Sequence, residues 1–132
     1  MVRGLALAAM ALAGTLAAAG TAVADPGGAG ALCNFTLSDP QLVTVSGTQM
    51  VTATVTPVAC TGIVKPISSQ VCISTPTRAG RCTELSGFDE AHVYFSPYEP
   101  GTSYTAKGRG CSAQTRPPAA VCTSLGPRTV TL

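Results

Sequence analysis

The 132-residue chain contains no tryptophan and one histidine, and only 11% of its residues carry a charge. His92 is therefore the single imidazole available as a general base near neutral pH. The net charge of +2 is too small for a general binder of nucleic acid or of anionic membranes. Composition thus argues against nucleic acid as a partner.

Long apolar runs are confined to the first 24 residues. Arg3 lies near the start, an Ala/Leu/Met-rich run follows, and Ala22-Val23-Ala24 ends it with a small-x-small pattern. This is the layout of a secretory signal peptide. We expect cleavage after Ala24, a flexible lead-in over 25–31 and a single domain over 32–132. No second apolar run follows, so we expect no membrane anchor and a secreted, extracellular or cell-envelope location.

Clustered metal ligands are also missing from the sequence. No two of the six cysteines are closer than Cys72 and Cys82, and His92 is the only histidine. A zinc site needs more closely spaced ligands, so we expect neither a metal nor a cofactor. An even number of cysteines in a short exported chain instead indicates disulfides.

Each pair of successive cysteines flanks a turn signal. Cys33 and Cys60 are equidistant from Ser46-Gly47, a candidate two-residue hairpin turn. Cys72 and Cys82 flank a segment centred on Thr77, and Cys111 and Cys122 flank Arg116-Pro117. Six cysteines allow many pairings. The sequential pairing is favoured, because each bridge would join neighbouring strand ends. A bridge across the fold, such as Cys60–Cys111, is the main alternative.

What the mature sequence does contain is alternation of apolar and polar residues. This period of two, typical of half-buried strands, runs through 49–57, 91–98 and 128–132. Further strands are expected at 34–37, 41–45, 70–74, 81–85 and 103–107. No apolar set recurs at helical spacing after the leader. Many short strands separated by Gly and Pro predict an all-β, antiparallel sandwich of seven to eight strands, braced by up to three disulfides.

One segment carries a resemblance to a known family. Residues 98–104 read YEPGTSY and resemble the L-x-P-x-T-x-Y corner of fibronectin type III domains, with Tyr98 at the Leu position. The resemblance implies an immunoglobulin/fibronectin-III-like sandwich. It also implies a structural role for Tyr104, whose hydroxyl would bind upstream backbone. The missing tryptophan argues against a true antibody-like domain.

Two further resemblances concern compartment and ligand. Gly101-Thr102-Ser103-Tyr104, followed by Cys111 and Cys122, is similar to the G-T-x-Y…C…C run of neocarzinostatin-type apoproteins. Those are exported actinobacterial sandwiches that hold a small chromophore, which makes sequestration of a small apolar ligand an alternative function. The whole chain looks like the small, exported, cysteine-containing proteins of mycobacteria and related actinobacteria, which mostly lack an assigned function.

Signatures of catalysis are weak. His92 has Asp89 and Glu90 nearby in sequence, but no G-x-S-x-G elbow is present. Gly108-Arg109-Gly110 matches neither a P-loop nor G-x-G-x-x-G. We expect its glycines to allow a bulge or a positive φ where a strand ends before Cys111. We therefore predict no enzyme. A secreted hydrolase would need His92 within hydrogen-bond reach of a serine or carboxylate in a cleft.

The leading prediction is an exported, non-enzymatic binding or cell-surface interaction module. Its partner would be an extracellular protein or a glycan, bound by loops at one end of the sandwich. The candidate loops are Phe88–Glu90 and Gly108–Pro118. The candidate binding residues are Phe88, Asp89, Glu90, Lys107, Arg109 and Arg116.

Overall fold

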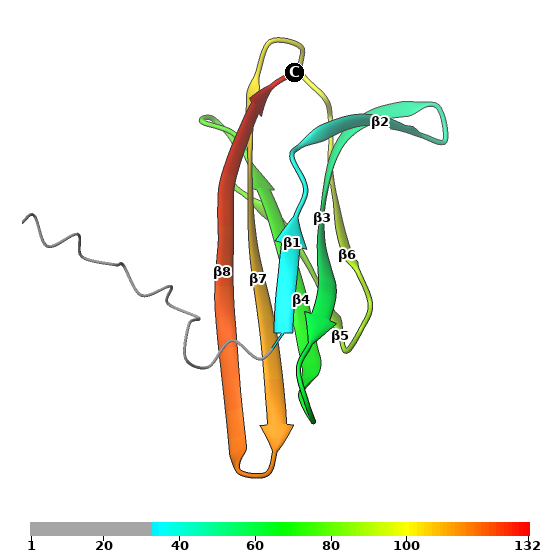
Figure 1. Cartoon of the computed structure of the whole chain (residues 1–132). Coiled ribbons are helices and arrows are strands. Elements are labelled where there is room, and N and C mark those ends of the chain that lie inside the picture. The colour runs from blue at the N-terminus through cyan, green and yellow to red at the C-terminus, as the bar shows by residue number, and fades with distance from the viewer. Residues whose placement is uncertain (1–32) are drawn as a thin grey trace, which may run out of the picture.

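The computed structural model describes residues 33–132. Over that range the chain forms two antiparallel sheets and no helix (Figure 1). The prediction of an all-β, antiparallel fold is therefore confirmed. The predicted signal peptide (1–24) and lead-in (25–31) lie outside the described residues. No helix among the described residues is long and apolar enough to cross a membrane.

The first sheet is built around one long central strand, β3 (Thr48–Cys60). Strands β1 (Cys33–Leu37) and β2 (Gln41–Val45) pair with successive parts of one edge of β3. Strand β6 (Ala91–Phe95) pairs with the other edge.

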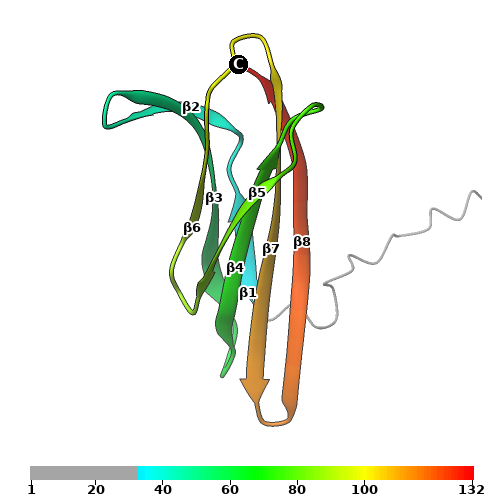
Figure 2. The ribbon, with the colours of Figure 1, turned by 180° about the vertical axis from the view of Figure 1, so that it is seen from behind.

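The second sheet has the strand order β5-β4-β7-β8. Strands β4 (Lys65–Ser74) and β5 (Arg81–Ser86) form one hairpin. Strands β7 (Ser103–Thr115) and β8 (Pro118–Thr131) form a longer one. Figure 2 shows β4 and β7 side by side in front of the first sheet.

The core lies between the sheets because alternate residues of each strand point inward. In β3 the apolar residues of the alternating run are fully buried, and the threonines between them are half-buried. The same alternation buries Val93 and Phe95 of β6 and leaves His92 and Tyr94 exposed. Together the inward side chains form one cluster: Leu37, Val51, Ala53, Val55, Val71, Ile73, Ala91, Val93, Phe95, Tyr104 and Ala106.

Tyr104 is the largest fully buried side chain, at the start of β7. The N–H of Glu99 donates to its hydroxyl oxygen at 2.8 Å, and the hydroxyl lies 3.4 Å from the carbonyl oxygen of Glu99. The contact with upstream backbone expected of Tyr104 is therefore present. Gly101, with φ of 74°, turns the chain after Pro100 as a type II turn requires.

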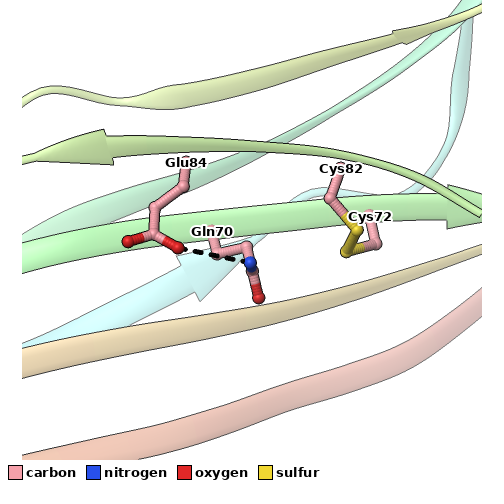
Figure 3. The surroundings of a disulfide bond; sticks show 4 residues. All are labelled: Gln70, Cys72, Cys82 and Glu84. Atoms are coloured by element: carbon pink, nitrogen blue, oxygen red, sulfur yellow. Dashed lines mark hydrogen bonds between the residues drawn. A yellow bond between two sulfur atoms is a disulfide. The ribbon is translucent and has the colours of Figure 1, made fainter.

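Three disulfides are formed, in the sequential pairing. Each joins residues directly opposite one another on neighbouring antiparallel strands, as Figure 3 shows for Cys72 and Cys82. The alternative Cys60–Cys111 bridge is absent among these residues. Because disulfides persist in oxidising compartments, the three bridges indicate such an environment.

The Cys33–Cys60 bridge depends on two compensating irregularities. Ser46-Gly47 forms the predicted two-residue turn, with positive φ at both residues. The break at Asp39-Pro40 shifts β1 by one residue, so that Leu37 pairs with Val55. A bulge between Asn34 and Phe35 shifts it back and brings the two cysteines opposite one another.

The expectation for Gly108-Arg109-Gly110 was only partly right, because an irregularity in the strand pairing lies there but neither a strand end nor a positive φ does. Strand β7 does not end there but continues to Thr115, and neither glycine has a positive φ. Both face inward, where a Cβ on Gly108 would meet Val55 at 2.5 Å and one on Gly110 would overlap the Phe35 ring. These glycines allow close approach of the facing sheet. A register shift does fall between Ala106 and Gly108.

Candidate functional site

The connections between strands divide the molecule into two ends (Figures 1 and 2). At one end, here called the loop end, lie the connections between β3 and β4 (61–64), β5 and β6 (87–90), and β7 and β8 (116–117). At the opposite end lies the connection between β6 and β7 (96–102), which contains the tyrosine contact. Both predicted binding regions reach the loop end.

Phe88 is the most exposed large apolar side chain of the described residues, at 68%. It stands after Gly87, which has φ of 69° and donates its N–H to the Ile67 carbonyl at 3.0 Å. The ring borders a hollow of about 120 Å³ whose other walls come from the end of β3: Pro57, Val58, Ala59 and Cys60. The Cys33–Cys60 disulfide holds that strand end to β1.

Other exposed apolar side chains accompany Phe88 at the loop end. Ile63 is 61% exposed and Val58 58%, against 44% for Ile67 and 40% for Leu85. Leu85 has the inward orientation of its pairing partner Ser69, but β5 is an edge strand, so no neighbour covers it fully. We call this set the loop-end patch: Val58, Ile63, Ile67, Leu85 and Phe88.

Asp89 and Glu90 are exposed beside Phe88, and Glu90 contacts the histidine. Its Oε2 lies 3.3 Å from Nε2 of His92. The other ring nitrogen, Nδ1, lies 3.0 Å from the hydroxyl oxygen of Thr54. Strand pairing explains this, since Thr54 is opposite His92 between β3 and β6. Sequence reasoning missed Thr54, which only the register of these strands could have identified.

Hydroxyl, imidazole and carboxylate thus follow one another on the outer face of the first sheet. A hydrolase would use such a series inside a cleft that excludes water. Here the side chains of His92 and Glu90 are 45% and 50% exposed. The hollow at the loop end is lined by other residues, so the series faces open solvent.

The basic candidates occupy two different places. Lys107 and Arg109 lie within β7 on the outer face of the second sheet, so their assignment to a loop was wrong. Arg109 pairs with Gln70 of β4, whose amide donates to Glu84 at 3.3 Å (Figure 3). Arg116 alone lies in the β7–β8 turn. The structure therefore separates Arg116 from Lys107 and Arg109.

Within residues 33–132, no group of three or more His, Cys, Asp or Glu side chains is arranged to hold a metal ion. The described residues define a disulfide-bonded protein of two packed antiparallel sheets. Comparisons with protein-family models, curated proteins and solved structures found no match for the chain. The geometry of the loop end is therefore the observation that bears on function.

Proposed function

We propose that this protein is an exported, non-enzymatic binding module that acts outside the cytoplasm, and that a partner protein covers its loop-end patch. The leader pattern of residues 1–24 and the three disulfides support the compartment. The single observation that carries the binding role is the loop-end patch itself.

The arrangement of strands supports an immunoglobulin/fibronectin-III-like sandwich. A sheet of β1 and β2, β3 and β6 faces a sheet in the order β5-β4-β7-β8. The buried Tyr104 lies at the start of β7, directly after the connection between the sheets. A tyrosine corner occupies the corresponding position in that architecture. Scaffolds of this kind present binding loops at the ends of the sandwich.

The chemistry of the patch favours a protein partner. Large apolar side chains that gather on a surface leave water favourably when another protein covers them. Aromatic anchors carry much of the binding energy in protein interfaces, and Phe88 is the aromatic residue of the patch, exposed beside a hollow that Val58 also lines. Asp89 and Glu90 supply a polar rim beside it.

The hollow is too small to favour sequestration of a small molecule. Its volume of about 120 Å³ is below the roughly 300–1,000 Å³ typical of small-molecule sites. The open position of His92 likewise gives a hydrolase no enclosed site. Both alternatives receive less support than a protein partner.

Partner capture tests the proposal with a matched pair of substitutions. Phe88→Ser removes the most exposed apolar side chain of the patch. Leu42→Ser changes a side chain of β2 that is 41% exposed and lies away from the loop end. Proteins from the extracellular and envelope fractions of the source cells should be retained by the wild type and by Leu42→Ser, and lost with Phe88→Ser. Equal retention by all three would contradict the proposed site.

A further inference from the structure

The free edges of the two sheets differ in how they are protected. Exposed edge strands invite pairing with other chains, and proteins normally protect them by charge, proline or short length. Edge strand β5 has six residues and carries Arg81 and Glu84. The edge formed by β1 and β2 is interrupted at Asp39-Pro40. Strand β6 has five residues, and its Tyr94 carbonyl lies within 3.5 Å of the Arg81 guanidinium.

Half of strand β8 has neither the charged residues nor the prolines that protect an edge strand. Residues 119–125 read AAVCTSL, without charge, proline or glycine. Further along, Arg128 of β8 forms an ion pair with Asp39 at 3.1 Å, which protects the other half of the strand. No strand within residues 33–132 pairs with the outer edge of β8.

The pairing with β7 shows which backbone groups face that free edge. The Cα atoms of Cys111 and Cys122 are 4.0 Å apart, the short separation of a non-hydrogen-bonded antiparallel pair. The N–H and C=O of Cys122 therefore point away from β7. Because this direction alternates along a strand, the same holds for Ala120 and Ser124. Three residues thus present unpaired donors and acceptors in a row.

We propose that a second copy of this chain pairs with residues 119–125 of β8, antiparallel and about a two-fold axis at Cys122. In this register Cys122 lies opposite its own copy, and Ala120 lies opposite Ser124. Both kinds of pair then exchange N–H···O=C hydrogen bonds in both directions. The two second sheets become one continuous sheet across the dimer.

The sequence of this segment is compatible with itself in that register. Val121 lies opposite Thr123 and Ala119 opposite Leu125, so no like charges meet. The same operation at β5, centred on Glu84, would place two carboxylates opposite one another. This difference selects β8 as the edge for self-association. A two-fold antiparallel pairing points the two loop ends in opposite directions, with Pro118 of each copy opposite Gly126 of the other. The pairing uses only β8, so the inference does not rest on the role of the loop-end patch.

Two double variants test both the dimer and its register. Ala120→Lys with Ser124→Lys places two lysines opposite one another at each of the two pairs. Ala120→Lys with Ser124→Glu places a lysine opposite a glutamate at the same pairs. Sedimentation of the oxidised protein over a concentration series should give a dimer for the wild type and for the Lys/Glu variant. The Lys/Lys variant should be monomeric at all concentrations used.

Hydrogen exchange supplies the second readout and the folding control. The amides of Ala120, Cys122 and Ser124 should be protected in the wild-type dimer and exchange rapidly in the Lys/Lys variant. Amides of β4 should stay protected in both, which shows that the fold is retained although position 124 pairs with Arg109. A monomeric wild type would overturn the proposal. A dimeric Lys/Lys variant would also overturn the proposal, because it would show that the dimer interface lies outside residues 119–125.

Discussion

Strand β6 is flanked by two connections of opposite character. The connection before it, residues 87–90, leaves the Phe88 ring 68% exposed. The connection after it, residues 96–102, is held by several contacts with the rest of the protein. Both contain or adjoin aromatic residues, so their difference cannot come from composition alone. It depends on what the neighbouring strands place next to each loop.

The connection after β6 is held by side chains from two other segments. The guanidinium of Arg78 donates to the Ser96 carbonyl at 2.6 Å and lies 4.4 Å from the centre of the Phe95 ring. The Tyr104 ring packs edge-on against Phe95, with centroids 6.0 Å apart. Tyr98 stacks on Tyr104, with ring centroids 6.3 Å apart. Aromatic side chains at this end thus close the core.

The connection before β6 has one backbone contact with a neighbouring strand, from Gly87 to Ile67. Phe88 borders a hollow and fills no gap in the core. An aromatic residue in or beside a loop thus contributes to the fold only where other elements cover it. An uncovered one is available to another molecule.

The largest loss of stability is expected when the buried aromatic residue Tyr104 is removed. Tyr104→Ala should destabilise the protein by about 3–5 kcal/mol, because it leaves a large cavity in the core. Tyr104→Phe should cost about 0.5–1.5 kcal/mol, because the part-buried N–H of Glu99 loses its acceptor. Denaturant unfolding with all disulfides intact measures both. A cost below 1 kcal/mol for Tyr104→Ala would show that this end does not anchor the fold.

A smaller loss of stability is expected from a substitution where the two sheets approach closely. Gly110→Ala should destabilise the protein by about 1–3 kcal/mol, since the new Cβ would overlap the Phe35 ring. The matched control is Gly80→Ala, whose Cβ would meet its nearest atom at 3.6 Å and should change stability by less than about 0.5 kcal/mol. In a Phe35→Ala background the cost of Gly110→Ala should shrink. An unchanged cost would exclude the ring as its cause.

The smallest effect on stability is expected at the loop end. Phe88→Ser should change the free energy of unfolding by no more than about 0.5 kcal/mol, because an exposed side chain loses few contacts. Thermal or denaturant unfolding, measured beside Tyr104→Ala, gives the comparison directly. A loss as large as that of Tyr104→Ala would mean that Phe88 belongs to the core and not to a binding surface.

Much of the fold could be predicted from local patterns. The alternation in 49–57 and 91–98 identified both strands and their buried faces, although β6 ends at Phe95. The predicted strand 103–107 covers only the start of β7. Gly108 and Gly110 lie beyond it, and without knowledge of the facing sheet, glycines indicate the end of a strand. The candidate site was predicted in part: Phe88 is exposed in a loop, whereas Lys107 and Arg109 lie on a strand.

Local sequence patterns were sufficient for the strand class and for the turn at Ser46-Gly47, and they favoured the sequential pairing of the cysteines over Cys60–Cys111 without deciding it. These depend on side-chain periodicity and on residues that tolerate particular backbone angles, both of which are local. Only the tertiary structure decided that Gly110 lies beneath Phe35, that Thr54 meets His92, and which apolar side chains remain exposed. Those outcomes depend on strand register and on sheet packing, which bring together residues far apart in the chain.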